Sequence, residues 1–347
     1  MITVGIVGHF GKGKICLDGQ TVKTINLANL LREKEDINLT EIDTDNWKKH
    51  PIKLILQTLK MCKKCQSVIM LPAHNGVKVF SSLLLFFKRK TTKLYYSVVG
   101  GWLPELVAAN KKLLKQLKKF DGIWVETKNM QLSLQKYGLE NVSIIPNFKN
   151  IEPLKESELS FEHKYPLRLC TFSRVHKQKG IEDAIQAVEE INREKGEIIY
   201  TLDIYGQIDN SYKDEFETLQ KTFPDFIAYK GMVDADKSVQ VLKDYFALLF
   251  PTRYYTEGLP GTILDAYASG VSVISARWQN FDDLIVEGKT GIGFDFEDYS
   301  VFKKVLKKVA ENPEIIYALK YNCLKEFEKY TKENISRLIT SELFKEN

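Results

Sequence analysis

The sequence contains no long apolar run. Its 347 residues nowhere reach the ~18 consecutive apolar positions that a membrane-spanning helix requires. The first residues also lack the basic segment followed by an apolar core that is typical of a secretory signal. Both absences predict a cytoplasmic protein, and 44% hydrophobic with 27% charged residues is the composition of an ordinary globular chain.

Cysteine is scarce, and no complete metal-binding pattern is present. Five scattered cysteines, an odd number, favour reduced thiols over a disulfide framework. Cys62 and Cys65 form a C-x-x-C, but no second pair or nearby histidine completes a zinc site. Asp43 and Asp45 resemble a metal-binding D-x-D, yet the same stretch is equally typical of a strand end. We therefore expect neither a metal nor a cofactor.

The charge is unevenly distributed along the chain. Residues 1–150 carry 24 Lys and Arg against 11 Asp and Glu, a net charge of +13, whereas the remainder carries 26 against 34, a net charge of −8. A basic half predicts an anionic partner such as a membrane surface, a lipid diphosphate or a nucleic acid. Nucleic acid is the least favoured of these, because the basic clusters lack the interleaved aromatic residues of a stacking platform.

Short apolar runs alternate with helical patterns throughout the first half of the chain. Apolar residues recur every three or four positions in the longer segments, which indicates helices. Strands are expected at residues 2–8, 37–43, 67–73, 93–99, 122–127 and 142–146, and helices at 21–35, 52–65, 103–120 and 129–138. This alternation favours a parallel, doubly wound α/β sheet.

Residues 145–166, rich in proline and charge, interrupt this rhythm and predict a linker. The alternation then restarts, and the chain is mainly helical after residue 296. A length of 347 residues also favours two domains over one. Two such domains would form a cleft at the carboxyl ends of their strands, where open α/β sheets bind ligands.

The most informative stretch is segment 247–276. A buried strand ends at Pro251, and a loop containing Glu257 leads through Gly-Leu-Pro-Gly into a helix. The N–H groups at the start of that helix suit a phosphate. Because a carboxylate would repel phosphate, Glu257 is better suited to sugar hydroxyls and Asp265 to a ribose. The alternatives are a solvated loop carboxylate for Glu257 and a helix-surface acid for Asp265.

These residues resemble a known family. The segment EGLPGTILDAYASGVSVI is similar to the pattern of retaining glycosyltransferases of family 4, in which seven residues separate two glutamates. Asp265 replaces the second glutamate, and Ser272 replaces a usual proline. The residues of this segment are most similar to those of bacterial capsule and exopolysaccharide transferases. The resemblance implies the GT-B fold, two facing Rossmann-like domains with a donor-binding cleft between them.

A second match, TFSRVHKQKGIEDAIQAV, implies that Arg174 and Lys179 face the donor diphosphate and form the catalytic set with Glu257. Ordinary surface cations are the alternative for both. The strand ends DIYGQ and AYKGMVD are similar to the family's nucleotide-binding strand ends. The implied donor-binding residues are Gly19, Gln20, Gly206, Met232, Val233, Gly258, Leu259, Pro260, Gly261, Thr262 and Asp265.

The resemblance also implies how the domains divide the work. Residues 1–148 and a C-terminal helix at about 326–347 would form the acceptor-binding domain, and residues 149–325 the nucleotide-sugar-binding domain. The implied activity is retaining, metal-independent transfer of a hexose to a hydroxyl from a nucleotide-diphosphate sugar, with UDP as the default nucleotide. A sugar-nucleotide epimerase or a phosphorylase of the same fold stays open as an alternative.

The glycine-rich loop near the N-terminus offers a different alternative. Residues 8–14 fit the phosphate loop of an ATPase, but Ile15 stands where the Mg²⁺-binding hydroxyl belongs, and the helix is expected only near Thr21. In the family that this chain resembles, the same loop approaches the donor pyrophosphate. Gly19 and Gln20, placed just before the helix, are the residues expected to make that contact.

The acceptor side carries weaker signals. Where the family often has a histidine after the strand at 93–99, this chain offers backbone donors and an aromatic surface. The expected sugar or acceptor contacts are His74, Gly100, Gly101, Trp102 and Tyr255, although loop packing is as good an explanation for Tyr255.

Two segments of the basic half, 77–94 and 110–120, combine apolar patches with clustered cations. Such segments suit an anionic headgroup layer, and the alternative is a helix with a solvated basic face. By resemblance, the acceptor is a polyprenyl-diphosphate-linked glycan. The protein would then lie peripherally at the inner face of the cell membrane.

Overall fold

The structure, a computed structural model, describes residues 1–11, 19–45, 47–161 and 164–345. The chain divides into two compact units, which are described separately here. The first unit comprises Met1–Lys149 together with Lys332–Asn347, and the second comprises Asn150–Thr331.

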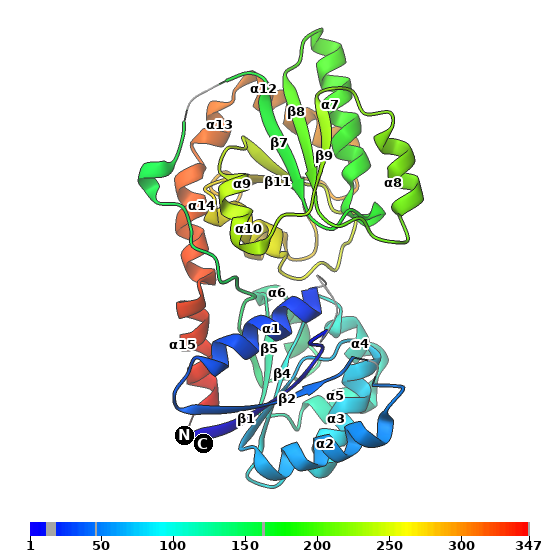
Figure 1. The fold of residues 1–347 in the computed structure, drawn as a ribbon, viewed down its shortest axis with the longest axis vertical. Helices are drawn as coiled ribbons and strands as arrows, with labels where there is room; N and C mark the ends of the chain where they lie inside the picture. Colours follow the sequence, from blue (N-terminus) through cyan, green and yellow to red (C-terminus); the bar gives the residue numbers. More distant parts are fainter. Residues whose placement is uncertain (12–18, 46, 162–163, 346–347) are drawn as a thin grey trace. The chain divides into compact units, whose positions relative to one another are not determined.

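The first unit is built on a six-stranded parallel sheet with the order β2-β1-β3-β4-β5-β6 (Figure 1). Its strands are β1 (Ile2–Gly8), β2 (Ile37–Asp43), β3 (Ser67–Met70), β4 (Lys93–Ser97), β5 (Gly122–Val125) and β6 (Val142–Ile144). Its helices are α1 (Gly19–Arg32), α2 (Pro51–Lys64), α3 (Asn75–Phe87), α4 (Leu103–Ala109), α5 (Lys111–Leu117), α6 (Lys128–Gln135) and α15 (Lys332–Leu343).

Both faces of this sheet are covered by helices, which makes the central strands apolar on both sides. α1 and α15 cover one face, where Val4, Ile6 and Ile335 share a cluster of buried side chains. The helices α2 to α6 cover the other face around Val7 and Tyr96. α15 is also fixed by a hydrogen bond that the Tyr95 hydroxyl donates to the Glu342 carbonyl at 2.9 Å, so the last helix belongs to this unit.

The second unit has a parallel sheet with the order β12-β11-β10-β7-β8-β9. Its strands are β7 (Leu167–Phe172), β8 (Tyr200–Tyr205), β9 (Ile227–Gly231), β10 (Ala247–Phe250), β11 (Ser272–Ala276) and β12 (Gly291–Phe294). The helices are α7 (Ile181–Lys195), α8 (Lys213–Gln220), α9 (Ser238–Leu242), α10 (Gly261–Ala268), α11 (Phe281–Leu284), α12 (Tyr299–Glu311), α13 (Glu314–Tyr317) and α14 (Lys320–Phe327). Short 3-10 turns lie at Glu156–Glu158, Lys177–Lys179, Ala235–Lys237 and Glu328–Tyr330.

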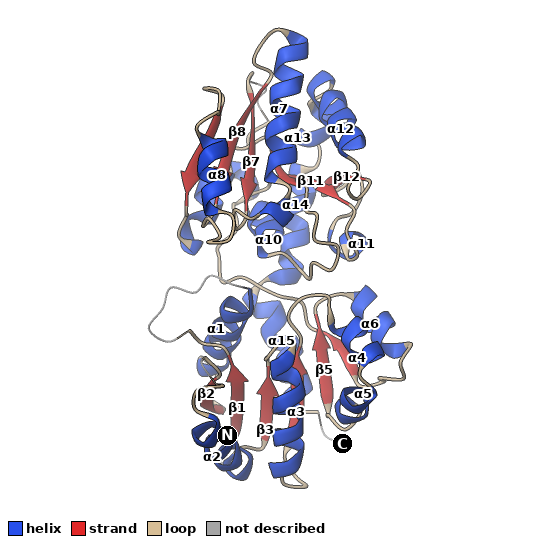
Figure 2. Ribbon diagram, turned by 90° about the vertical axis from the view of Figure 1, so that its right-hand side faces the viewer, coloured by secondary structure: helices blue, strands red, loops and turns tan. Residues whose placement is uncertain are grey.

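Helices also enclose the second sheet (Figure 2). α7 and α12 pack with Leu169 and Leu202 on one face, and α10 and α14 pack with Cys170 and Leu248 on the other. The two six-stranded parallel sheets confirm the α/β class predicted from the alternating pattern. Among the described residues, no helix combines the length and the apolar character needed to cross a bilayer.

Three predicted helix boundaries were wrong. The expected helix at 103–120 is two helices, because the Asn110 side chain accepts the backbone N–H of Leu113 at 2.9 Å and starts α5 there. The expected C-terminal helix at 326–347 is also interrupted, since α14 ends at Phe327 and α15 begins at Lys332. The first helix begins at Gly19 rather than near Thr21.

Candidate functional site

The candidate site of the second unit lies at the carboxyl ends of β7, β8 and β10. Two glycines bring the loops after these strands together. Gly180 has φ +66°, and a Cβ there would lie 1.9 Å from the Pro251 carbonyl oxygen. Gly206 has φ +131°, and its Cβ would lie 1.9 Å from the Ser173 carbonyl oxygen. Only glycine permits this close approach of two backbone segments. The two glycines therefore hold together the loops that carry the polar residues of the site.

Lys179 and Glu257 form an ion pair across this edge. The Lys179 ammonium lies 2.5 Å from a Glu257 carboxylate oxygen, and the side chains are 21% and 16% exposed. The Thr252 hydroxyl donates to the same carboxylate at 3.5 Å, and the Asn280 amide donates to the Glu257 backbone carbonyl at 2.6 Å. Glu257 is therefore not a solvated loop carboxylate, and Lys179 is not an ordinary surface cation.

Arg174 is held by a different carboxylate. Its guanidinium lies 3.2 Å from Asp209, and the Arg174 side chain is 47% exposed. The hydroxyl and the backbone N–H of Ser211, followed by Arg174, lower the pKa of Asp209 to about 2. Asp209 consequently stays ionised at neutral pH and keeps the guanidinium at the end of β7.

The segment Gly258–Thr262 carries the chain into α10, which begins at Gly261 after Pro260. The first N–H groups of a helix have no partner within the helix, so Gly261 and Thr262 present donors at this end. The Thr262 hydroxyl is buried and has no hydrogen-bond partner in the described part of the chain.

Asp265 lies on α10 with only 1% of its surface exposed. The alternative of a helix-surface acid is therefore wrong, and the expected ribose contact stays a prediction. Leu259, also buried, packs in the core beneath the loop.

The other predicted donor residues of this unit are more open. Met232 follows β9 and is 58% exposed, and Val233 beside it is half-buried. Tyr255 is 54% exposed, and its ring lies 5.2 Å from that of Phe296 in an edge-on arrangement, so part of its role is loop packing.

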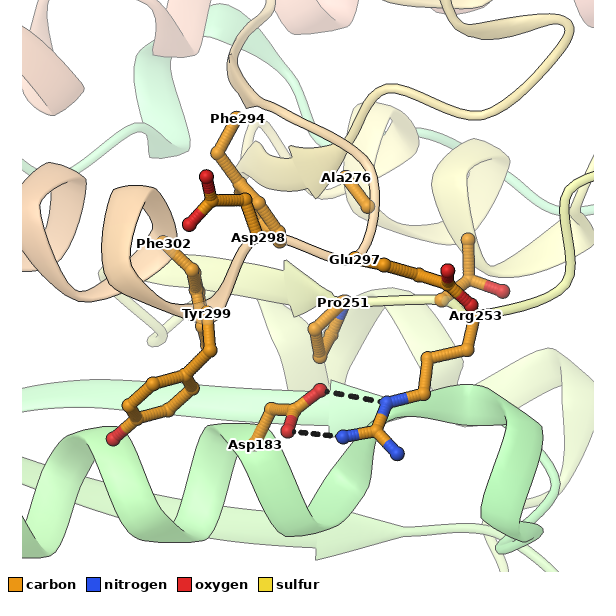
Figure 3. Close-up of a pocket in the computed structure, with 10 residues that line it drawn as sticks. Asp183, Pro251, Arg253, Ala276, Phe294, Glu297, Asp298, Tyr299 and Phe302 are labelled. Atoms are coloured by element: carbon orange, nitrogen blue, oxygen red, sulfur yellow. Dashed lines mark hydrogen bonds and ion pairs between the residues drawn. The ribbon is translucent and has the colours of Figure 1, made fainter.

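A small pocket adjoins the same loop (Figure 3). Asp183 accepts two hydrogen bonds from the Arg253 guanidinium, at 3.0 and 2.6 Å, and the Arg253 backbone N–H donates to the Gln178 carbonyl at 2.8 Å. Thr252 lines this pocket and also contacts Glu257. These contacts of Arg253 join the loop after β10 to α7, a link that the sequence analysis did not predict.

In the first unit, the structure brings several predicted contact residues together. The His74 ring stacks on the Trp102 ring with centroids 4.4 Å apart, and the Trp102 indole N–H donates to the Val99 carbonyl at 2.7 Å. His74 has φ +46°, which is unusual for a residue with a side chain, and Gly100 has φ +78°. Gly101, between Gly100 and Trp102 in the sequence, is buried. Together they form a platform at the carboxyl ends of β3 and β4.

The sequence analysis missed a buried ion pair in the first unit. Lys23 of α1 donates to a Glu126 carboxylate oxygen at 2.7 Å and to the Val98 carbonyl at 2.6 Å. The two side chains are only 6% and 3% exposed. The residues stand 103 positions apart in sequence, so no local motif signals the pair.

A second missed cluster lies beside β1. His9 Nδ1 is 2.6 Å from the Thr21 hydroxyl, and its Nε2 is 3.5 Å from Asp45. Asp43 accepts the backbone N–H groups of Phe10 and Asp45, at 3.1 and 2.9 Å. The D-x-D stretch therefore closes a strand end, which was one of its two predicted interpretations.

The two cysteines of the C-x-x-C are buried in the core, where burial raises the pKa of the Cys62 thiol to about 11. Most of the suspected phosphate loop, including Lys14 and Ile15, lies outside the described residues. Gly19 and Gln20, expected just before the first helix, form its first turn.

The sheet order and layers define the GT-B class, and solved structures of that class resemble the whole chain. HepE from Anabaena, solved in complex with UDP, has a TM-score of 0.76 at 13% identity and covers 99% of both chains. The sucrose-phosphate synthase of Thermosynechococcus elongatus has a TM-score of 0.77 at 13% identity and covers 98% of both. The predicted GT-B fold is thus confirmed.

Comparisons of sequence identify the second unit further. Residues 166–312 match the family described as glycosyl transferases group 1. An uncharacterized glycosyltransferase of Methanocaldococcus jannaschii is 23% identical over 65% of this chain and 55% of its own length. An uncharacterized protein of the cps region of Klebsiella pneumoniae is 27% identical over 43% of this chain and 38% of its own length. The alignments thus span about half or less of these relatives, and together they support a glycosyltransferase.

Proposed function

We propose that this protein is a retaining glycosyltransferase. It transfers a hexose from a UDP-sugar, without a metal ion, to a hydroxyl of a lipid-linked or growing polysaccharide. The observation that carries the proposal is the Lys179–Glu257 pair, which lies at the start of α10 within the segment that matches the group 1 family.

The donor is assigned to the second unit because its groups match the parts of a nucleotide sugar. Lys179, Arg174 and the first N–H groups of α10 suit the diphosphate, whose negative charge grows as it leaves. The Glu257 carboxylate suits sugar hydroxyls, and its bond to Lys179 offsets the repulsion between carboxylate and phosphate. Gly206, Met232 and Val233 stand at the neighbouring strand ends, where the nucleoside would extend.

The reaction moves one bond and one proton. The bond between the anomeric carbon and the diphosphate oxygen breaks, and its electron pair leaves with UDP. The acceptor hydroxyl attacks from the same face, which retains the configuration, and its proton passes to the departing phosphate oxygen. Fixed cations at the leaving group supply the electrostatic stabilisation that a metal would otherwise provide.

The acceptor is assigned to the first unit. Trp102 is only 8% exposed and supports the exposed His74 ring that stacks on it, and this ring next to the backbone of Gly100 suits a sugar. The net charge of +13 over residues 1–150 favours an anionic acceptor, and the resemblance of segment 247–276 to capsule and exopolysaccharide transferases favours a polysaccharide on a polyprenyl diphosphate. The enzyme would then work at the inner face of the cell membrane.

Thermal unfolding in the presence of UDP, GDP or Mg²⁺-ATP, each with and without a chelator, tests the donor assignment. A ligand that binds only the folded state stabilises it by ~2.7 kcal/mol at 100 times its dissociation constant. We expect UDP to raise the melting temperature equally with and without chelator. Stabilisation by Mg²⁺-ATP alone would contradict the proposal. Retention is tested by the anomeric configuration of the product.

A further inference from the structure

The outward face of α2 presents aliphatic side chains to solvent. Ile52 is 74% exposed, Leu56 60% and Ile55 38%. The opposite face of the same helix is buried, with Leu54 and Met61 in the core. Ile52 and Leu56 are one turn apart, so the exposed side chains form a continuous strip on the face directed away from the sheet.

Further along α2, the same exposed face carries lysines. Lys60 and Lys63 follow Leu56 at helical spacing and are exposed, as are Lys53 and Lys64. α2 therefore has an aliphatic first half and a basic second half along one face. The neighbouring α3 packs beside α2 and connects the next pair of parallel strands. Its last turn carries Phe86, which is 81% exposed, and Lys88, Arg89 and Lys90 follow the helix.

The stretch of sequence that contains this strip is rich in cations. Between Asp45 and Glu105 the sequence contains 11 Lys and Arg and no Asp or Glu. This interval includes α2, β3, α3 and β4. Neighbouring elements do carry carboxylates, such as Glu41 on β2 and Asp121 beside Lys88, but the charged residues of α2 and α3 themselves are all cations. Exposed aliphatic chains next to such cations complement a layer that is apolar inside and anionic outside.

We propose that the α2 strip, defined as Ile52, Ile55, Leu56, Lys60 and Lys63, docks the protein on an anionic lipid bilayer. The aliphatic half enters the boundary between headgroups and acyl chains while the lysines contact lipid phosphates. Sequence analysis had pointed instead to residues 77–94 and 110–120. The structure buries the apolar faces of those segments at Val77, Leu84 and Leu117, so apart from Phe86 they contribute mainly charge.

A nucleic acid suits this strip less well. Single strands are bound by aromatic side chains on which bases stack, whereas the strip consists of branched aliphatic residues. The inference deepens the proposed function, because it specifies where an enzyme with a lipid-linked acceptor would contact the membrane.

Sedimentation of the full chain with phosphatidylcholine vesicles, with and without phosphatidylglycerol, tests the strip. We expect binding that requires phosphatidylglycerol. Ile52→Asn with Leu56→Asn should lower the partition coefficient at least tenfold, and Lys60→Gln with Lys63→Gln about 25-fold, since each cation near such a surface contributes about fivefold. The matched control is Leu132→Asn on α6, a leucine 48% exposed, which should bind as the unsubstituted protein does.

Two results would overturn the inference: unchanged vesicle binding by the Ile52→Asn/Leu56→Asn variant, or binding of duplex DNA but not of anionic vesicles. Stabilisation by UDP, measured without vesicles on the same variants, separates this inference from the proposed function. Loss of vesicle binding with intact UDP stabilisation supports the strip. If the unsubstituted protein binds vesicles but is not stabilised by UDP, the donor assignment fails and the strip stands.

Discussion

The two units assemble the polar edges of their sheets in different ways. In the second unit the site residues come from three short segments, 173–180, 206–209 and 251–265, each of which directly follows a strand. In the first unit the residues of the platform also follow strands closely, but the most buried charges, Lys23 and Glu126, come from a helix and from the end of β5, 103 positions apart. The first unit also contains the strongly basic α2 and α3 region, whereas residues beyond 150 carry a net charge of −8.

This difference indicates which property of the protein a substitution in each unit would change. Short segments that bind a diphosphate keep a fixed spacing, because the phosphate contacts depend on loop backbone and on the first turn of a helix. The buried pair of Lys23 and Glu126 is not tied to one loop, and removing either partner destabilises the unit. We therefore expect changes in the second unit to abolish turnover, and changes in the first unit to alter stability and acceptor use.

The largest effect is expected at the Lys179–Glu257 pair. Glu257→Gln and Lys179→Met should each lower the turnover number by about 100- to 1000-fold, because each removes a charge that acts at the leaving group or at the transferred sugar. The measurement is the initial rate of UDP release with a saturating donor. The matched control is Lys177→Met, whose ion pair with Glu215 is half exposed, and it should retain near-normal turnover. Folded variants with unchanged rates would refute the assignment.

The next effect concerns stability in the first unit. Lys23→Met leaves the Glu126 carboxylate buried without its ammonium partner, which costs about 3–5 kcal/mol. The double variant Lys23→Met/Glu126→Gln should recover part of this loss, since no charge is then buried. Urea unfolding measures both. Lys332→Met serves as a control because its partner Glu33 is more than half exposed, and its cost should stay below about 1 kcal/mol. If Lys23→Met and Lys332→Met lowered the free energy of unfolding equally, burial of the ion pair would not determine how much its loss destabilises the protein.

How far the sequence could predict these features depends on the range of the interactions. The α/β alternation, the strand at 37–43 and the loop carrying Glu257 follow from local periodicity and turn residues, and the structure has them. The Lys179–Glu257 contact joins residues 78 positions apart, so the sequence indicated both residues but not their pairing. Nor could it indicate the break at Asn110, because an asparagine inside a helical pattern starts a new helix only when the following turn reaches its side chain.

A smaller effect is expected at the glycine that joins the loops after β7 and β8. Gly206→Ala places a Cβ against the Ser173 carbonyl and should cost about 1–3 kcal/mol of stability while weakening UDP binding. Gly196→Ala is the comparison. Gly196 also has positive φ, but a Cβ there meets no atom within 4 Å, so only the backbone strain of about 1 kcal/mol applies. Thermal unfolding with and without UDP distinguishes the two variants. Equal losses of stability at both positions would argue against a close contact between residue 206 and the Ser173 carbonyl.

The smallest effect concerns acid stability at Asp209. Hydrogen bonds from Ser211 and the charge of Arg174 lower its folded-state pKa to about 2, below its ordinary value of 3.8. A carboxyl group with a lowered pKa contributes stability above its ordinary value, and the contribution is lost as the pH falls from near 4 through 2. Because the partner Arg174 is 47% exposed, we expect less than about 1 kcal/mol. Asp209→Asn should therefore flatten the fall of unfolding free energy between pH 4 and 2, measured in urea. An unchanged slope would mean that Asp209 is not held by Ser211 and Arg174 in the folded protein, and would leave Arg174 without the anchor that keeps it at the end of β7.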